Sequence, residues 1–497
     1  MAHFPDDCPA AAAGGDAAAR LRDGLDRGGY TEAAVAGMLG LAEPPADRRL
    51  KHDLPLYLWR TRDPSPLATL VRLFLLGQPV STAAAADALR PLALDDGVRC
   101  GLLTADAAGV RAAVQIIPYQ DVWVAADWPD AAVAEPVMGV AASTRALAQM
   151  MIPGPVGRAL DLGTGSGVLA LLAARDAARV VAVDLNPRAV AVTAFNARLN
   201  GVGNVEARAG DLFDPVRGEA FDRIVCNPPF VIAPAAGRLH SRAGRPADDL
   251  FRSIVRAAPE FLRPGGFCQV VGNWVHPAGG DWRERLAGWF AGLGCDAWVL
   301  HARTEDAATY AHQRVAETTD DPAEAARLFD EWVAYYGQAG IAAVGFGVIT
   351  LRRSDKPACW FRCDRLPDAA GPCGAAIARG FALRDFLDAH RDDQALLAAR
   401  VRRADGLRWD RRSDLAAGGW AVAESQLRLT TGLAFAGAAE AAVAEFVAGC
   451  TGGATLGDDL SRLAAKLGRD RRQFAPAFLA LVRRLIEVGI LVPADVS

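Results

Sequence analysis

The chain has 497 residues, of which 52% are hydrophobic and 23% charged, and its formal net charge at pH 7 is −4. This length and apolar content predict roughly three domains with buried cores. The net charge argues against a protein that holds nucleic acid by bulk electrostatic attraction. No apolar run approaches the ~18 residues of a membrane span, and the N-terminus lacks a secretory pattern. We therefore expect a cytoplasmic protein without a membrane partner or a metal centre, whose scattered cysteines stay reduced.

The first part of the chain changes from a helical to an alternating pattern. Residues 21–92 carry apolar positions at helical spacing, and Thr31 and Ser81 are candidate N-caps. Residues 98–125 then alternate apolar and polar positions in short runs, which is typical of strands. Helices followed by short strands predict a winged-helix-like domain over residues 1–130. Such a domain often binds nucleic acid or protein, but a substrate lid or a dimer face explains the pattern equally well.

Residues 158–173, RALDLGTGSGVLALLA, predict a buried strand, a glycine-rich turn and a helix. The glycines of such a turn let a ligand approach the backbone at the N-terminus of the helix. The spacing differs from the dinucleotide-binding fingerprint, because only one residue separates the second glycine from the third, where that fingerprint has two. Asp161, which would repel a pyrophosphate, suits a ligand that carries an ammonium and a sulfonium group.

Three further features follow at the ends of predicted strands. Asp184 ends the β-branched run at residues 180–183, and an acid there can accept hydrogen bonds from both ribose hydroxyls of a nucleoside. Asp211 follows the strand predicted at residues 205–209. The tetrapeptide Asn227-Pro228-Pro229-Phe230 comes directly after residues 221–226 and is the most specific motif of the sequence.

In this order and spacing, the four features resemble the class I S-adenosylmethionine (SAM) methyltransferases. The tetrapeptide is similar to the (N/D)-P-P-(Y/F/W) motif of enzymes that methylate a nitrogen of a planar group, such as adenine, guanine or a glutamine amide. The match is nearest to the group of release-factor glutamine and ribosomal-RNA guanine or adenine N-methyltransferases. It implies an α/β fold, with a Rossmann-like seven-stranded sheet in a SAM-dependent methyltransferase domain at residues 131–365.

The resemblance also implies SAM as the cofactor and assigns the site residues. Thr144 lies at the start of a helix predicted at residues 145–151, where it could contact SAM or simply cap the helix. The implied catalytic residues are Asn227, Pro228, Pro229 and Phe230. The implied cofactor-binding residues are Asp161, Gly163, Thr164, Gly165, Gly167, Asp184, Leu185, Asp211, Leu212, Asn227 and Thr144.

The rest of the chain predicts the surroundings of the site. The loop at residues 231–246, which includes His240, follows the catalytic motif and is expected to face the acceptor. A helical insert at residues 304–336 is expected to overhang the site, before residues 342–351 pair with residues 359–363 in an antiparallel hairpin. Residues 366–497 read as helices with a break near residues 406–419, and predict a C-terminal helical, winged-helix-like domain.

The side chains of the tetrapeptide suit a poorly nucleophilic nitrogen. The Asn227 side-chain oxygen and the Pro228 carbonyl can accept its two N–H groups, and the consecutive prolines stiffen this geometry. Phe230 can stack on the planar group. The acceptor classes left open are a protein glutamine, a nucleobase and a small metabolite. The alternatives are an O- or N-methyltransferase of secondary metabolism and a non-catalytic, SAM-sensing regulator that binds nucleic acid; an intact motif counts against the regulator.

Overall fold

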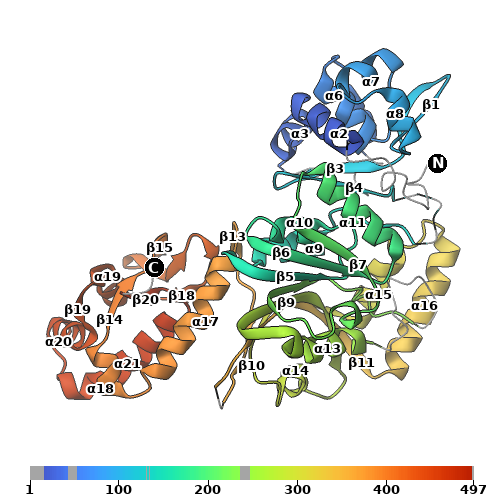
Figure 1. Ribbon diagram of the computed structural model, residues 1–497. Helices are drawn as coiled ribbons and strands as arrows, with labels where there is room; N and C mark the ends of the chain where they lie inside the picture. The colour runs from blue at the N-terminus through green and yellow to red at the C-terminus, as the bar shows by residue number, and fades with distance from the viewer. Residues whose placement is uncertain are drawn as a thin grey trace. The chain divides into compact units, whose positions relative to one another are not determined.

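The computed structural model describes residues 16–42, 53–129, 131, 133, 135–234, 247–356 and 358–494. The chain divides into two compact units. The first contains Met1–Ala148 and Gly154–Asp364, and the second contains Gln149–Pro153 and Arg365–Ser497 (Figure 1). None of the described helices combines the length and the hydropathy that crossing a bilayer requires.

The N-terminal part of the first unit is mainly helical (Figure 1). Its helices are α2 (Asp16–Arg27), α3 (Glu32–Leu39), α5 (Leu54–Arg60), α6 (Pro66–Leu70), the π-helical turn η1 (Val71–Leu75), α7 (Thr82–Ala88) and α8 (Leu94–Arg99). Thr31 and Ser81 cap α3 and α7, because their hydroxyls accept hydrogen bonds from the backbone of the first turn. Two short antiparallel strands follow, β1 (Leu103–Asp106) and β2 (Gly109–Ala112), and Val80 pairs with Val110 of β2.

A hairpin joins this part to the large sheet domain of the same unit. It consists of β3 (Gln115–Tyr119) and β4 (Val122–Ala126). Asn196 of α11 (Pro187–Leu199) bonds both backbone groups of Ala125, at 2.9 and 2.8 Å. Asn200, which caps the C-terminus of α11, bonds the backbone of Trp123 in the same way. Two asparagine amides therefore satisfy the edge of β4 in place of a third strand.

The large sheet has eight strands in the order β12-β10-β11-β9-β8-β5-β6-β7. The strands are β5 (Val156–Leu162), β6 (Ala177–Asp184), β7 (Val205–Ala209), β8 (Phe221–Cys226), β9 (Leu262–Pro277), β10 (Cys295–Asp306), β11 (Ile341–Arg353) and β12 (Phe361–Arg365). The five strands from β7 to β9 are parallel, whereas β11 runs antiparallel to both β9 and β10. The expected α/β architecture with a large, mostly parallel sheet is confirmed.

The sheet differs from the sequence prediction at one edge. The predicted hairpin of residues 342–351 with residues 359–363 does not form, because β11 already has β9 and β10 on its two sides. Instead, β12 pairs with the outer edge of β10, as an eighth strand where seven were expected. The predicted insert forms α15 (Ala307–Ala316) and α16 (Pro322–Gln338), between β10 and β11.

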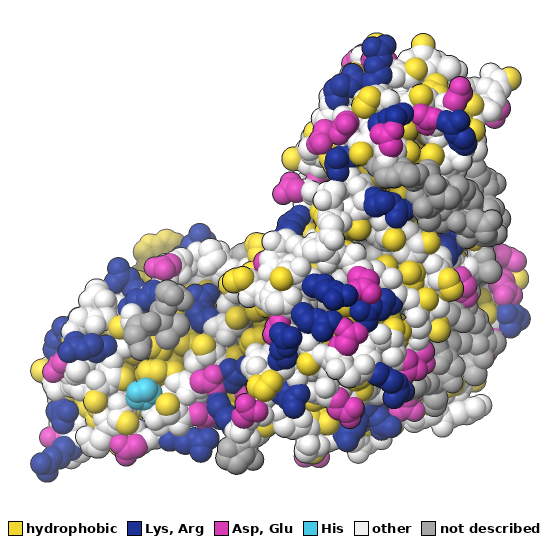
Figure 2. Space-filling model, in the orientation of Figure 1, with side chains coloured by type: hydrophobic (Ala, Val, Ile, Leu, Met, Phe, Trp, Pro, Cys, Tyr) yellow, Lys and Arg dark blue, Asp and Glu magenta, His cyan; other side chains and the backbone are white. Residues whose placement is uncertain are grey.

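Helices cover the faces of the sheet (Figure 1). They include α9 (Ala142–Met150), α10 (Val168–Ala173), α11, α13 (Asp249–Ala257) and α14 (Trp282–Phe290). The chain enters the sheet at β5, extends through β6 and β7 on one side, and returns to β8 on the other. Ligands of such sheets bind at the carboxyl ends of the strands where the order reverses. On the visible face, acidic and basic side chains are intermixed over most of the surface (Figure 2).

The second unit combines helices with three small antiparallel sheets among its described residues. One has the order β19-β14-β20, another has the order β15-β16-β18, and the third pairs β13 (Ala369–Ala370) with β17 (Gly432–Leu433). Its main elements are α17 (Gly374–Ala389), α18 (Asp393–Ala398), β14 (Arg400–Arg403), β15 (Leu407–Ala416), β16 (Gly419–Leu429), β18 (Ala436–Ala438), α19 (Ala441–Gly449), β19 (Thr451–Thr455), α20 (Leu456–Lys466), α21 (Arg471–Glu487) and β20 (Leu491–Pro493). The predicted break near residues 406–419 is instead part of the hairpin β15–β16. Most of its side chains are exposed on both faces, so the apolar alternation that signals a strand is missing.

Candidate functional site

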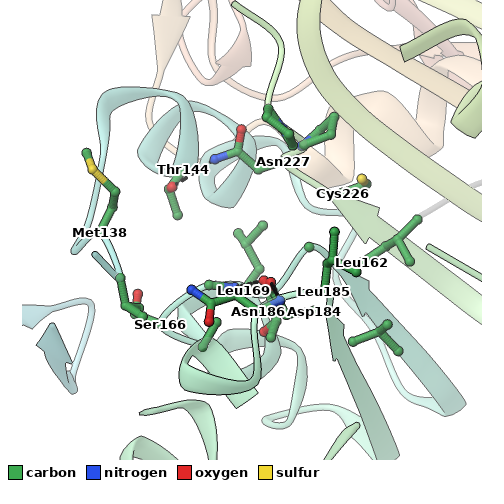
Figure 3. Close-up of a pocket in the computed structure, with 18 of the residues that line it drawn as sticks. Met138, Thr144, Leu162, Ser166, Leu169, Asp184, Leu185, Asn186, Cys226 and Asn227 are labelled. Carbon is green, nitrogen blue, oxygen red and sulfur yellow. Dashed lines mark hydrogen bonds between the residues drawn. The ribbon is translucent and has the colours of Figure 1, made fainter. Parts of the chain in front are cut away.

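A cavity of about 400 Å³ lies at the carboxyl ends of β5, β6 and β8. Its walls come from the approach to α9, the glycine turn after β5, the end of β6, the turn after β7 and the Asn-Pro-Pro-Phe segment after β8. In Figure 3, Asn227 and Thr144 lie on one side of the open space, and Asp184, Leu185 and Asn186 lie on the opposite side. The fold therefore brings the predicted motifs together around one space.

The three glycines of the turn have different surroundings. Gly163, Gly165 and Gly167 all have a positive φ, at 73°, 56° and 82°. A Cβ atom placed on Gly165 would meet nothing within 4 Å, whereas one on Gly167 would lie 2.9 Å from Thr193 Cγ2. Gly163, Thr164 and Gly165 line the cavity, but Gly167 does not. Gly167 is therefore explained by the packing of the turn against α11, and a role in cofactor binding has no support from its position.

Asp161 lies beneath this turn, fully buried and outside the cavity lining. Its Oδ2 accepts hydrogen bonds from the Thr164 hydroxyl at 2.6 Å and from the Ala170 backbone N–H at 3.0 Å. Its Oδ1 is buried and has no hydrogen-bond partner among the described residues. Burial disfavours the charged form and raises the pKa of Asp161 to about 7, and the nearby Asp184 charge acts in the same direction. A cation bound near this carboxylate would favour its ionised form.

Asp184 and Asp211 end two neighbouring strands. The Asp184 oxygens accept hydrogen bonds from the backbone N–H groups of Gly165 at 2.8 Å and Asn186 at 2.9 Å. Asp184 also lines the cavity, where a carboxylate can accept hydrogen bonds from a ligand. Asp211 and Leu212 line the cavity at the turn after β7, where Leu212 has an unusual positive φ of 46°. Leu185 also lines the cavity and is 49% exposed.

The nitrogen and the oxygen of the Asn227 side-chain amide have different surroundings. Its Nδ2 donates hydrogen bonds to the hydroxyl oxygens of Ser143 at 3.1 Å and Thr144 at 3.0 Å. Its Oδ1 is buried and has no partner among the described residues. Because α9 begins at Ala142, Ser143 and Thr144 lie in its first turn and not at its N-cap. The two hydroxyls therefore fix the nitrogen end of the amide and leave the oxygen for a donor in the cavity.

The other three residues of the motif shape the adjoining wall. Pro228 is buried, and both prolines line the cavity. The Phe230 ring is half-buried, with its centroid 5.9 Å from that of Phe346 on β11. The Arg303 guanidinium of β10 lies 4.4 Å from the Phe346 centroid. His240 and most of the predicted acceptor-facing loop lie outside the described residues.

Sequence reasoning missed several residues at this site. Ser143 carries no sequence signal beyond that of a possible helix cap, and Phe346 lies more than 100 positions after the catalytic motif. Met138, Ser166 and Asn186 also line the cavity, next to predicted site residues in the chain. The sequence indicates these three residues only through their position next to predicted site residues. Within the described part of the chain, no group of three or more His, Cys, Asp or Glu side chains is placed to hold a metal ion.

Comparison with known families agrees with this geometry. Residues 138–279 match the family described as methyltransferase small domain. We refer to this region as the methyltransferase small domain, after the family that it matches. The flanking regions match two families described only as domains of unknown function, at residues 27–113 and 378–493. The methyltransferase small domain thus covers β5 to β9 and every cavity wall named above, including the Asn-Pro-Pro-Phe segment.

Curated relatives of the methyltransferase small domain are named as glutamine and ribosomal-RNA methyltransferases. The release factor glutamine methyltransferase of Xylella fastidiosa is 36% identical over 129 residues, which are 24% of this chain and 47% of that protein. The ribosomal protein uL3 glutamine methyltransferase of Bordetella pertussis is 41% identical over 127 residues, 23% of this chain and 43% of the relative. The ribosomal RNA small subunit methyltransferase C of Alcanivorax borkumensis is 34% identical over 120 residues, 24% and 33% of the two chains. This chain spans about half the length of the release-factor relatives it matches.

Among solved structures, a T. thermophilus 16S rRNA methyltransferase in complex with AdoMet and guanosine is 26% identical. The match covers 32% of this chain and 42% of that one, with a TM-score of 0.24. A putative methyltransferase from Bacillus halodurans is 17% identical and covers 43% of this chain and 99% of that one, with a TM-score of 0.28.

The residues at and beneath the cavity fit SAM, the cofactor that the sequence resemblance implies. The cavity is of the size that a nucleoside with an amino-acid arm requires. Open space faces the backbone of Gly165, and a side chain there would fill it. The carboxylate of Asp161 has an oxygen that lacks a partner among the described residues, and SAM carries two positive charges on its methionine arm.

Proposed function

We propose that this protein transfers the methyl group of SAM to a nitrogen of a planar amide or amine. The observation that carries the proposal is the Asn227 side chain, whose Nδ2 is held by Ser143 and Thr144 while its buried Oδ1 has no partner in the described structure. An unpaired acceptor of this kind costs free energy unless a ligand donates to it. An amide or ring-amino N–H is such a donor.

The chemistry assigns simple tasks to the chain's own residues. SAM supplies an electrophilic methyl group on sulfur, and the reaction replaces the carbon–sulfur bond with a carbon–nitrogen bond. Asn227 Oδ1 and the Pro228 carbonyl accept the two N–H groups and favour localisation of the nitrogen lone pair. Phe230 stacks on the planar group and keeps the nitrogen in line with the methyl carbon. Asn227 is neutral and no strong base, so the proton leaves to solvent after the transfer.

Roles for the cofactor-binding residues follow from their positions in the cavity. We assign the ribose hydroxyls to Asp184 and the adenine to Asp211, with Leu185 and Leu212 as apolar walls. The backbone of residues 163–165 faces the methionine arm, and Asp161 beneath the turn balances its charge. Thr144 acts through Asn227, a role that replaces the direct SAM contact suggested by its sequence position.

We propose three domains, at residues 1–130, 131–365 and 366–497, of which the first two belong almost entirely to the first compact unit. We propose that both flanks are winged-helix variants. In the N-terminal flank, α6, Val80, α7, α8, β1 and β2 follow the order helix, strand, helix, helix, strand, strand. In the C-terminal flank, α19, β19, α20, α21 and β20 follow the order helix, strand, helix, helix, strand, with one strand after the last helix instead of two. The central strand of its sheet is β14, which comes earlier in the chain.

The third helix of the N-terminal winged-helix variant argues against DNA recognition. In DNA-binding members this helix enters the major groove. Here it is α8, which carries Asp95 and Asp96 in its first turn. Carboxylates at that position would face phosphates and base edges with the wrong charge. A role in shaping the acceptor site or in contacting another protein is therefore favoured over a DNA-binding regulator.

The relatives suggest which acceptors to test first. Their names specify glutamine of a release factor, glutamine of ribosomal protein uL3, and small-subunit ribosomal RNA. We propose a cytoplasmic protein that acts on one such component of translation. Purified release factor, uL3 and ribosomal RNA, followed by extract of cells that lack the gene, are incubated with labelled SAM and either the wild-type protein or Asn227→Ala. Label that depends on Asn227 supports the proposal, and its absence from every fraction overturns it.

A further inference from the structure

The insert α15–α16 is hydrogen-bonded to the segment that follows the catalytic motif. The Tyr310 hydroxyl of α15 accepts the Ile232 backbone N–H at 3.3 Å and the Asn273 Nδ2 at 2.7 Å. The Tyr336 hydroxyl of α16 donates to the Ile232 carbonyl at 2.6 Å. Both tyrosines and Ile232 are buried, so two phenols from different helices satisfy both backbone groups of one residue. Ile232 lies two positions after Phe230.

Further contacts extend this attachment. The Tyr335 hydroxyl of α16 accepts the Ala247 backbone N–H at 3.2 Å, just before α13. Phe346, in the middle of β11, packs against Phe230 itself. Tyr310, Tyr335, Tyr336 and Phe346 lie outside the range that matches the methyltransferase small domain, whereas their partners Phe230, Ile232, Ala247 and Asn273 lie within it. The insert is therefore an addition to the methyltransferase small domain that is built directly onto its acceptor side.

The surface of this insert is strongly acidic. Residues 304–338 contain eight acidic residues and two arginines, a formal charge of −6 that exceeds the −4 of the whole chain. Both arginines are already paired within the insert, Arg314 with Glu317 and Arg327 with Glu324 and Glu331. Tyr336 is the one buried residue of α16, and Phe329, Trp332 and Tyr335 are partly buried beside it. Asp330 and Glu331 of the same helix are exposed. Figure 2 shows acidic side chains at the edge of the molecule where Figure 1 draws α16. The acidic residues are Glu305, Asp306, Glu317, Asp320, Asp321, Glu324, Asp330 and Glu331.

We propose that the α15–α16 insert is a docking surface for a cationic polypeptide segment that flanks the methyl-accepting residue. The inference rests on the proposed function, because the insert is attached to the segment that contains the unpartnered Asn227 oxygen. An acidic surface attracts lysine- and arginine-rich chain and repels the phosphates of RNA. Because the tyrosines attach the insert to the segment next to Asn227, a polypeptide docked on the insert would hold its acceptor residue at a fixed position relative to Asn227.

The test measures binding without methyl transfer, so it is independent of the proposed reaction. The probe is a short fluorescent peptide of arginine, glycine and alanine with one central glutamine, and its fluorescence anisotropy is followed with the full-length protein. Asp320→Asn with Asp330→Asn removes two exposed charges that cap no helix. This variant should bind the peptide about three- to tenfold more weakly at low salt, with a smaller loss of affinity on adding salt.

A matched control separates a local effect from net charge. Asp63→Asn with Asp95→Asn removes two exposed carboxylates from the N-terminal part and should change the affinity by less than about twofold. Equal binding by the wild-type protein and the insert variant would overturn the inference. So would tighter binding of a ribosomal RNA fragment than of the peptide, because that outcome assigns the surface to nucleic acid. Peptide binding that depends on the insert, without any methylated acceptor, would leave the docking surface standing and reject the proposed reaction alone.

Discussion

The side-chain nitrogen of Asn227 lies 3.0 Å from the hydroxyl oxygen of Thr144, a residue 83 positions earlier in the chain. A second hydroxyl, from Ser143, lies 3.1 Å from the same nitrogen. An asparagine amide can bind in either of two orientations that differ by a half-turn. In this structure both hydroxyls accept from Nδ2, so Oδ1 remains for the methyl acceptor.

This geometry predicts different effects for the two partners. Asn227→Ala removes the oriented acceptor and should lower kcat by two to three decades, or ~3–4 kcal/mol, with little change in SAM affinity. Thr144→Val with Ser143→Ala should lower kcat by about tenfold, because the amide persists but is no longer oriented. Steady-state kinetics on the labelled acceptor and calorimetry with SAM provide the measurements. Full turnover by Asn227→Ala would mean that the Asn-Pro-Pro-Phe motif is a structural turn without a catalytic role.

A second prediction concerns the ribose. Asp184→Ala should weaken SAM binding by ~1.5–3 kcal/mol, the scale for hydrogen bonds to a charged group. The substitution also frees the backbone N–H groups of Gly165 and Asn186, which lie at the cavity wall. Calorimetry measures the dissociation constant, with Asp214→Ala as the control because its recorded ion pair is with exposed Arg217. An unchanged constant in Asp184→Ala contradicts the assignment.

The glycine turn gives a paired prediction. Gly165→Val should abolish SAM binding but cost only ~1–2 kcal/mol of stability, because its positive φ is unfavourable while its Cβ meets open space. Gly167→Val should destabilise the fold much more, since its side chain would collide with Thr193. Thermal unfolding without SAM and calorimetry with SAM distinguish the two positions. If Gly165→Val unfolds as readily as Gly167→Val, the turn is purely structural.

The sheet from β5 to β9 could be predicted because its strands are buried runs that end in recognisable motifs. Asp184, Asp211 and Asn227 each follow such a run, so the carboxyl-end rule placed them in one crevice. The position of β12 could not be predicted, since it depends on which strand edge is left unpaired after β10 and β11 associate. The local sequence pattern of a strand does not show which of the other strands it will pair with.

The orientation of the site's side chains also could not be predicted from the sequence. The Asn227 amide is oriented by hydroxyls from a helix that begins three residues earlier than its apolar pattern suggested. The contact of Phe230 with Phe346 depends on the register of β9 with β11, which pairs Asn273 with Phe346. Both relationships join segments that are far apart in the chain and become visible only in the folded sheet.

Asp161 predicts a dependence of stability on pH. Its pKa is raised from 3.8 to about 7 by burial, so between these pH values the folded state binds more protons than the unfolded state. The contribution of this residue to stability without SAM should therefore fall as pH rises from about 4 to about 7. Asp161→Asn removes the titration, and its melting temperature relative to wild type should increase over the same interval.

The affinity for SAM should depend on pH in the opposite direction to this contribution to stability. The positive charges of SAM favour the ionised carboxylate, so SAM affinity should rise with pH through about 7 and flatten above it. Calorimetry at several pH values tests the wild-type protein against Asp161→Asn, which should show a flatter profile. If the wild-type affinity for SAM does not change between pH 5 and 8, the charge of Asp161 makes no contribution to binding the cofactor.

The final prediction tests the attachment of the insert. Tyr336→Phe keeps the ring but removes the donor to the Ile232 carbonyl, which lies 2.6 Å away. A buried carbonyl without a partner shifts or loosens its segment, at a cost of ~1–3 kcal/mol. Because Ile232 follows the catalytic motif, the KM for the acceptor should rise about three- to tenfold, with kcat less affected and SAM affinity unchanged.

Tyr30→Phe is the matched control. Tyr30 is also fully buried, and its hydroxyl donates to the Ile116 carbonyl at 2.8 Å in the N-terminal part of the chain. Both substitutions should lower the melting temperature, because each leaves a buried carbonyl unpaired. Only Tyr336→Phe should raise the KM for the acceptor, since only that phenol holds the segment next to Phe230. If the two variants lose stability alike and retain the same KM, the Tyr336 hydrogen bond supports the fold alone.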